Sequence, residues 1–412
     1  MDSKAIAGII VVAIVAIAGI SIFALSGDND KGGNGNDGSS EKYVTDALGR
    51  NVAIPANLDN GIVTIGSCGP LRFASMFDVF DDLIEVDKGD ITDNRNGRGY
   101  SYAYGYNTLD VNTQSHPDNA LESATAESIA SKNPSLVITY EQIWNNYSEN
   151  FQLLSKRCTI VVLKNQQMKF MTDDKGGLAE YFEFNVNLLG KVLSKEDRAK
   201  EVISGIEGLL DDIRSLSGTS DKKVYVAGMT ISGSNSLNTT FPTYLPFTIN
   251  GINNAYDGGS TENKVVMTVE AFTKTAMDMI VVDPSSSDKI KDNPDSQYVL
   301  EYLYGINNDS DASNDIPIYV TVPIVWDSIN YDASLASAYY TAYLVYGNLT
   351  LEETKKKINN VFEVFYGEHG SNVFEDMKEF FVGKSSSYGQ EMPVLGEVVV
   401  KKNDSGYYLA AA

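Results

Sequence analysis

The most regular alternation of hydrophobic and polar positions lies between Leu178 and Leu216. In its second half the apolar residues stand three or four positions apart, which is the spacing of one face of a helix. They are Val202, Ile206, Leu209, Leu210, Ile213 and Leu216. Ser194, followed by acidic residues, has the features of a helix N-cap, and Gly218 those of a helix end. The pattern predicts two consecutive helices, the second of them long.

A second pattern occurs once on each side of these helices. Thr125–Thr139 and Thr268–Val282 both begin with Thr and Glu in a short helical stretch and end in an apolar, β-branched run. In both copies the same number of residues separates the glutamate from the predicted buried strand. We interpret the repeat as two similar α/β lobes joined by a rigid helical linker.

Strand-like runs alternate with helical ones along most of the remaining chain, which predicts an α/β fold with mainly parallel sheets. We expect an N-terminal lobe over residues 43–177, linker helices over 178–218 and a C-terminal lobe over 219–400. In such sheets ligands bind beyond the carboxyl ends of the strands. The loops that follow the strands would therefore line one cleft between the lobes.

Those loops supply an aromatic and mildly polar set of side chains. The candidate ligand-binding residues are Arg72, Tyr140, Trp144, Asn235, Phe241, Trp326 and Tyr331. The sequence YSYAYGY at 100–106 would place its four tyrosines on one side if it is extended. It is either a surface loop packed by its own aromatics or an aromatic wall for a ligand, in which Tyr102 and Tyr104 would take part.

The N-terminus carries an uncharged run of 21 residues from Ala5 to Leu25, preceded by Lys4. This length spans a bilayer with the positive end in the cytoplasm. We expect residues 1–25 to be a transmembrane anchor or, alternatively, a cleaved signal peptide. The polar segment 26–42 would then be a flexible tether that holds the folded body outside the membrane.

Composition excludes several classes of function. A formal net charge of −23 argues against nucleic acid as a partner of the folded part. The sequence has two histidines and no zinc, P-loop or nucleophile-elbow motif, so we expect neither an enzyme nor a bound metal or cofactor. Cys68 and Cys158 are too few for a disulfide scaffold, and either a bridge or two free thiols remains open.

Three motifs resemble the periplasmic binding proteins of the ferric-siderophore and vitamin B12 type. The opening VTDALGRNVAIP keeps the family's Asp-x-x-Gly-Arg, and the first repeat keeps its Glu-x-Ile and Pro-x-Leu-Val-Ile spacing. The matching residues are Asp46, Gly49, Arg50, Glu127, Ile129, Pro134, Leu136, Val137 and Ile138, with a looser match at Gly251–Asn254. The Tyr-rich segment and the chain beyond Gly367 depart from the family pattern.

The resemblance implies two Rossmann-like lobes joined by a long helix, with a metal chelate held in the cleft and delivered to an ABC permease. It also implies one permease-docking glutamate on each lobe, at Glu127 and Glu270. We expect a monomer whose ligand is an iron–siderophore chelate or, alternatively, a corrinoid. A surface structural or adhesion protein is a further alternative, as is an enzyme built on the same fold. The tether without a lipid-anchor cysteine, the acidic balance and five Asn-x-Ser/Thr sequons suggest an archaeal cell surface.

Overall fold

The computed structural model describes most of the chain beyond residue 41. The described ranges are 42–91, 97–104, 114–117, 119–165, 169–173, 176–229, 236–260, 264–286, 293–308, 312–326, 328–387 and 393–412. The predicted anchor at 1–25 and nearly all of the predicted tether lie outside them. Among the described residues no helix combines the length and the apolar character needed to cross a membrane.

The first sheet has five strands in the order β5-β4-β3-β6-β7, and all of its pairings are parallel. The strands are β3 (Ile62–Thr64), β4 (Leu83–Asp87), β5 (Gln114–His116), β6 (Leu136–Tyr140) and β7 (Thr159–Leu163). Every residue of β3 and β6 is buried. Uninterrupted apolar runs are typical of parallel strands that are covered on both faces, so this sheet forms as the sequence predicts.

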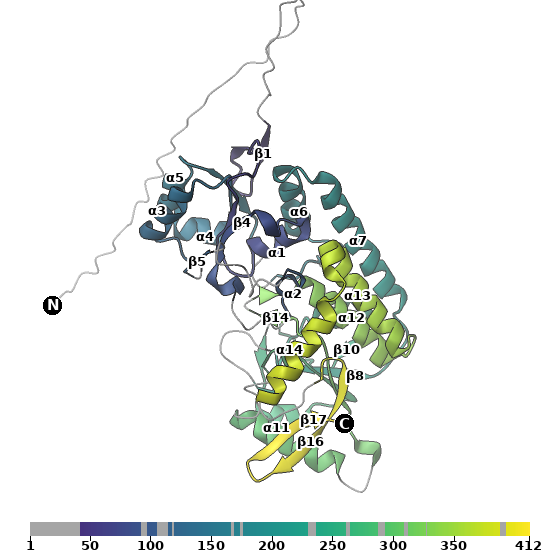
Figure 1. The fold of residues 1–412 in the computed structure, drawn as a ribbon. Helices are drawn as coiled ribbons and strands as arrows, with labels where there is room; N and C mark the ends of the chain where they lie inside the picture. Colours follow the sequence, from purple (N-terminus) through teal and green to yellow (C-terminus); the bar gives the residue numbers. More distant parts are fainter. Residues whose placement is uncertain are drawn as a thin grey trace, which may run out of the picture. The chain divides into compact units, whose positions relative to one another are not determined.

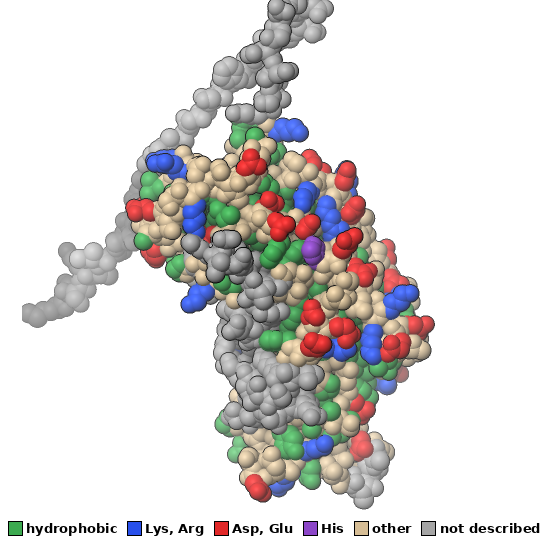
Figure 2. Space-filling model, in the orientation of Figure 1, with side chains coloured by type: hydrophobic (Ala, Val, Ile, Leu, Met, Phe, Trp, Pro, Cys, Tyr) green, Lys and Arg blue, Asp and Glu red, His purple; other side chains and the backbone are tan. Residues whose placement is uncertain are grey.

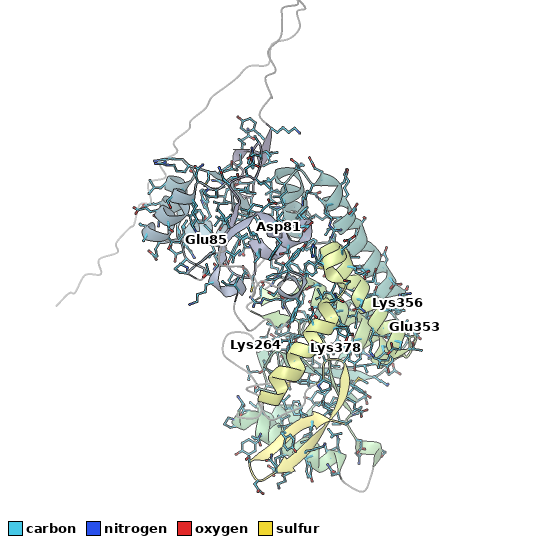
Figure 3. The ribbon with its side chains drawn as sticks, in the orientation of Figure 1. Asp81, Glu85, Lys264, Glu353, Lys356 and Lys378 are labelled. Atoms are coloured by element: carbon cyan, nitrogen blue, oxygen red, sulfur yellow. The ribbon has the colours of Figure 1, made fainter. Side chains whose placement is uncertain are left out.

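The first half of the chain also forms several short helices. They are α1 (Pro70–Ala74), η1 (Ser75–Phe77), η2 (Phe80–Asp82), η3 (Lys88–Ile91), α2 (Gly99–Ala103), α3 (Ser123–Lys132), α4 (Glu141–Asn146) and α5 (Ser148–Leu154). Lys132 at the end of α3 bonds Glu85 of β4 at 2.6 Å, and Figure 3 labels that glutamate. This ion pair is mostly buried and fixes the first repeat helix to the sheet.

A two-stranded hairpin, β1 (Tyr43–Thr45) and β2 (Asn51–Ala53), opens the folded body. The buried Asp46 carboxylate accepts hydrogen bonds from the backbone N–H groups of Leu48 and Arg50, both at 3.1 Å. It also accepts from the Arg50 side chain and from the N–H of Val162 in β7. Gly49 between them has φ +72°, which favours glycine. The Asp-x-x-Gly-Arg motif is therefore a turn that fixes the hairpin to the sheet.

The linker consists of α6 (Glu180–Val192) and α7 (Glu196–Ser215). The apolar face predicted for α7 is confirmed, because Val202, Ile206, Leu209, Leu210 and Ile213 are buried. The predicted N-cap is wrong: Ser194 has φ +55° and Lys195 takes the cap position without a side-chain bond. Lys195 instead donates to the carbonyl oxygens of Phe77 and Asp78.

Arg198 of α7 joins the two parts of the fold. Its guanidinium donates to the carbonyl oxygen of Met76 in η1 at 3.0 Å and to those of Val364 and Phe365 in α13 (Leu351–Tyr366). Asp212, further along α7, accepts from Tyr339 and Lys357. Figure 1 shows α7 running beside α13.

The second sheet has six strands in the order β10-β8-β12-β13-β16-β17. They are β8 (Lys223–Ala227), β10 (Asn253–Asn254), β12 (Met279–Val282), β13 (Ile318–Val320), β16 (Gly396–Asn403) and β17 (Gly406–Ala411). The first four are parallel, whereas β16 and β17 form an antiparallel hairpin on β13, drawn in yellow in Figure 1. This sheet thus continues to residue 411, past the end expected at residue 400.

The other elements of the second half are mostly helices. They are β9 (Thr239–Thr240), α8 (Leu245–Asn250), β11 (Val265–Val266), α9 (Val269–Lys274), η5 (Pro284–Ser286), α11 (Pro294–Asn307), η6 (Ala312–Asn314), β14 (Val325–Trp326), β15 (Ser328–Ile329), α12 (Tyr331–Tyr346), η7 (Gly367–Gly370) and α14 (Val373–Ser387). The second copy of the repeat is α9 followed by β12, as α3 is followed by β6 in the first. Thr268 caps α9 by accepting from Ala271 N–H at 3.1 Å.

Candidate functional site

The elements around the first sheet, including η1 and α2, form the first half of the fold, and the elements from β8 onward form the second half. The two halves contact each other along a buried boundary. We call this boundary the seam. On one side lie α1, η3 and α2, and on the other lie β15, α12 and the end of α13. The loops that follow parallel strands β3, β4 and β13 meet here, where the sequence predicts a ligand site.

Arg72 of α1 crosses the seam. Its Nη1 donates to the carbonyl oxygen of Ile329 at 2.7 Å, and its Nη2 donates to Asn330 Oδ1 at 3.0 Å. The guanidinium also lies 5.2 Å from the centre of the Tyr331 ring. Burial works against its charge, but neighbouring Tyr100, Tyr331 and Asp332 outweigh that cost and raise the pKa of Arg72. Arg72 is therefore a permanent buried cation at the seam.

Asp332, at the start of α12, is a carboxylate on the far side of the seam that interacts electrostatically with Arg72. Tyr366 donates its hydroxyl to Asp332 Oδ2 at 2.7 Å, and Ala333 N–H donates to Oδ1 at 2.8 Å. Burial raises the pKa of Asp332 to about 6, against the opposing effects of these bonds and of Arg72. The negative charge at this position thus changes within an accessible pH range.

A second polar group lies on the N-terminal side of the seam. Asp90 Oδ1 accepts from Tyr100 at 2.7 Å and from Cys68 N–H at 2.9 Å. Arg98, itself buried, donates to the carbonyl oxygen of Gly89 at 2.6 Å. Burial raises the pKa of Asp90, while the Arg98 charge and the Tyr100 bond oppose the shift. The seam therefore holds two buried arginines and two buried aspartates.

Two further aspartates stand at strand ends and hold the flanking loops. Asp87 at the end of β4 accepts from the N–H groups of Gly66 and Asn119 at 3.0 and 2.9 Å. Asp283, just after β12, accepts from the N–H groups of Ser285 and Ile324, both at 2.8 Å. Asp87 thus ties together the loops after the neighbouring strands β3 and β5, and Asp283 ties the loop after its own strand to the loop after β13.

In the described part of the Tyr-rich segment, residues 100–103 are helical, so the condition under which its tyrosines would share one side is not met there. Gly99–Ala103 is a helical turn, α2, and Tyr106 lies outside the described residues. The rings of Tyr100, Tyr102 and Tyr104 are buried. Helix geometry places residues two apart on different faces, and here these side chains meet different elements.

The other candidate ligand-binding residues fall at separate places. Tyr331 is buried at the seam and shares a 3.2 Å hydrogen bond with Tyr181 of α6. Tyr140 is buried beside Gly66 and Asn119. Trp144 stacks on Phe151 and on the Arg50 guanidinium, at the opening hairpin. Phe241 is fully buried in the hydrophobic core.

The structure thus brings Arg72 and Tyr331 together, and it places α2 with Tyr102 and Tyr104 at the same seam. Asn235 and the side chain of Trp326 lie outside the described part of the protein. Sequence reasoning missed Asp90, Asp332 and Tyr366. The sequence could have indicated Asp332, because this aspartate directly follows the candidate residue Tyr331 at the start of a helix.

The two glutamates proposed for docking are exposed on equivalent repeat helices, Glu127 on α3 and Glu270 on α9. Glu270 bonds Lys274 one turn later at 2.5 Å, and both side chains are well exposed. Figure 2 shows many acidic side chains spread over the face it presents. The two glutamates therefore differ from other surface acids by their repeated position.

Cys68 and Cys158 form no disulfide with each other, so the alternative of two thiols holds. Burial raises the pKa of Cys158 to about 11, which keeps it as a thiol. Across the described ranges, no group of three or more His, Cys, Asp or Glu residues is placed to hold a metal ion.

A periplasmic binding protein family model matches residues 101–297. This range includes both repeat copies and the linker helices between them. The resemblance predicted from the sequence is therefore confirmed. Members of this family bind small molecules outside the cytoplasm and work with ABC permeases. No curated protein sequence matches the chain.

Solved structures share the fold at low sequence identity. A periplasmic solute-binding protein of Veillonella parvula aligns with a TM-score of 0.55 and 16% identity, over 81% of this chain and 96% of its own. The molybdate-binding protein MolA of Haemophilus influenzae, with molybdate bound, gives 0.52 and 16%, over 79% and 98%. At this identity the likeness establishes the α/β fold with mainly parallel sheets.

Proposed function

We propose that this protein is the extracytoplasmic substrate-binding component of an ABC importer, and that it binds a metal chelate between its two lobes. The observation that carries the proposal is the convergence of strand-end loops on a seam bridged by Arg72, between two mainly parallel sheets joined by α6 and α7. The family match supports the same role.

The chemistry of the seam favours a chelate with aromatic or anionic groups. Tyrosine rings offer flat apolar surface with a polar end. Arg72 and Arg98 offer permanent positive charge. An iron–siderophore chelate combines these properties and is our first candidate. A corrinoid, whose large ring suits aromatic contacts, is the second.

The ligand is best identified by mass spectrometry of whatever co-purifies with the folded chain. A thermal-shift screen would follow with a ferric hydroxamate, a ferric catecholate, haem, cobalamin and molybdate. A saturating ligand at 100 times its Kd stabilises the folded state by about 2.7 kcal/mol, which is a readily measured shift. We expect an iron chelate to give the largest shift. A response to none of the five would favour a structural or adhesive surface protein.

We further propose that Glu127 and Glu270 dock on the permease, one from each lobe. Two exposed carboxylates at repeated positions can pair with basic groups on two permease subunits and set the orientation of the complex. The double variant Glu127→Ala, Glu270→Ala should lose transport and keep ligand affinity. Glu207→Ala, an exposed acid on the linker helix α7, is the matched control. Lost affinity in the double variant would show that these acids serve the ligand instead.

The N-terminal segment would hold the protein at the outer face of the membrane. Its length and lack of charge support an anchor, with a cleaved signal peptide as the alternative. The intact mass of protein purified from the native membrane separates the two, because cleavage would remove the first 25 residues or so. Release of the protein by high salt alone would contradict the anchor.

A further inference from the structure

Residues 97–104, which we call the strap, contact both sides of the seam. Tyr100 and Arg98 bind Asp90 and the Gly89 carbonyl on the N-terminal side. The hydroxyl of Tyr104 donates to the carbonyl oxygen of Ser75 at 2.8 Å on that same side. The strap thus has a firm attachment to the first half of the fold.

On the other side the strap lies against the second half at two glycines. A methyl group on Gly97 would be 1.8 Å from the carbonyl oxygen of Pro323, and one on Gly99 would be 1.8 Å from Asp332 Oδ2. Neither glycine has a left-handed φ, so backbone conformation does not require glycine at these positions. A larger residue does not fit because the neighbouring atoms lie too close. The backbone of the strap is therefore packed directly on the loop before β14 and on the first turn of α12.

Aromatic contacts extend this packing to the C-terminal helices. The Tyr102 ring meets Phe380 of α14 edge-on, with centroids 6.0 Å apart. The Tyr104 ring lies 6.4 Å from Tyr366 and 4.6 Å from His369. Figure 1 shows α2 beside α13 and α14. The two regions that depart from the family pattern, the Tyr-rich segment and the chain beyond Gly367, thus pack on one another.

We propose that the strap and α14 form a clasp that fixes the two halves of the protein in one arrangement without any ligand. The linker helices and the Arg72 bonds already join the halves, and the clasp adds a further, separate connection across the seam. Each added connection reduces the freedom of the two halves to open. The contacts that form the clasp are all between protein groups, so they do not depend on which ligand the seam binds.

Gly99→Ala tests the clasp in the full chain. Ordinary contacts of a methyl carbon begin near 3.4 Å, so the strap and Asp332 would have to separate by about 1.6 Å. Nitroxide labels at Ser128→Cys on α3 and Ala271→Cys on α9, both exposed, report the distance between the halves. Cys158→Ser removes the half-buried native thiol, and the buried Cys68 stays.

We expect one narrow distance distribution in the ligand-free parent protein. In Gly99→Ala it should broaden or lengthen, because the added methyl requires a separation of about 1.6 Å between the strap and Asp332. Gly208→Ala on α7, where a methyl meets nothing within 4 Å, is the matched control and should match the parent. A folded Gly99→Ala protein with an unchanged distribution would overturn the proposal, as would a broad distribution in the parent.

Phe380→Ala gives a second route if Gly99→Ala fails to fold. This ring is only partly buried, so its loss should release the strap and leave both cores intact. Hydrogen exchange at the amides of Ser101 and Tyr104, which bond within the strap, should then accelerate at least tenfold. Unchanged exchange would count against the clasp. Because no ligand is present in these measurements, their outcome is separate from that of the transport proposal.

Discussion

The two halves of the protein are alike in how they build their sheets and different in how they end. Each has a repeat helix that leads into a buried parallel strand, and each has a buried aspartate at a strand end, Asp87 or Asp283, that fixes loops. Only the first half carries the short helix α2, and only the second continues into α14 and the β16–β17 hairpin. Of these unshared pieces, α2 and α14 meet at the seam.

The difference indicates a division of roles between shared and unshared parts. Shared elements form the two cores and position the strand-end loops. Unshared elements decide how the halves are held against each other. Four substitutions test this division, from the largest expected effect to the smallest. They lie in the opening hairpin of the first half, at the loop aspartate of the second half, at a contact of the linker and on the surface.

The largest effect is expected from Asp46→Ala in the opening hairpin. The substitution leaves the N–H groups of Leu48, Arg50 and Val162 without their acceptor and the Arg50 charge without its partner. Removing one partner of a buried ion pair typically costs 3–5 kcal/mol. Urea unfolding should show a loss of about that size, whereas the exposed Asp59→Ala control should stay within about 0.5 kcal/mol. A small loss would mean that the hairpin does not anchor the first half.

Asp283→Asn probes the matching loop in the second half through pH. Burial raises the pKa of Asp283 to about 6, above its value in the unfolded chain, so the folded state binds more protons between pH 4 and 6. The free energy of unfolding of the parent should therefore rise, relative to the variant, as the pH falls from 7 to 5. Over each pH unit in which the folded state holds one more proton than the unfolded state, the free energy of unfolding changes by about 1.4 kcal/mol. Denaturation curves at both pH values measure this difference. A pH-independent difference would show that Asp283 titrates normally.

Lys357→Ala weakens a contact between the linker and the second half. Asp212 would keep Tyr339 at 2.7 Å and lose the Lys357 ammonium, a pair about one third exposed. Partial exposure limits the loss of stability to about 1 kcal/mol. Lys355→Ala, which breaks a more exposed pair with Glu352 on the same helix, is the control and should cost less. Equal losses of stability in the two variants would show that the contact between Lys357 and Asp212 contributes no more than an ordinary surface ion pair.

The smallest effect is expected for Lys274→Ala on the repeat helix α9. Its pair with Glu270 is fully solvated on both sides, and such pairs contribute ~0.3–0.5 kcal/mol. Thermal unfolding should therefore barely change. Transport should be kept or improved, because Glu270 would be released for docking. Lost transport with unchanged stability would give Lys274 itself a docking role.

The sequence alone was sufficient to predict most of the parallel strands and the linker, since β6, β12 and α7 each have a clear hydrophobic pattern, whereas the short strands β5 and β10 have none. It failed at α2, because alternating tyrosines suggest an extended segment and the contacts that make it helical come from α13 and α14. It also misplaced the cap of α7 at Ser194, where contacts of Lys195 with the Phe77 and Asp78 carbonyls set the geometry instead.

The candidate site was predicted less completely than the fold. Arg72 and Tyr331 meet because the loops after parallel strands converge, which is a general property of such sheets. Trp144 and Phe241 also follow strands, yet one packs on Arg50 and the other lies in the core. The sequence shows which residues lie in the loops after strands. It does not show where their side chains point, because that depends on neighbours that are distant in the sequence. Asp90, Asp332 and Tyr366 were missed for the same reason.

Calorimetric titration measures directly whether a metal chelate binds between the two halves. The parent protein, freed of co-purified ligand, would be titrated with the chelate that gives the largest thermal shift. We expect one site per chain with a Kd of about 1 μM or tighter, and weaker binding in Arg72→Lys, whose single ammonium cannot reproduce the two bonds across the seam. Tight binding unaffected by Arg72→Lys would place the site elsewhere, and no heat with any chelate would contradict the claim.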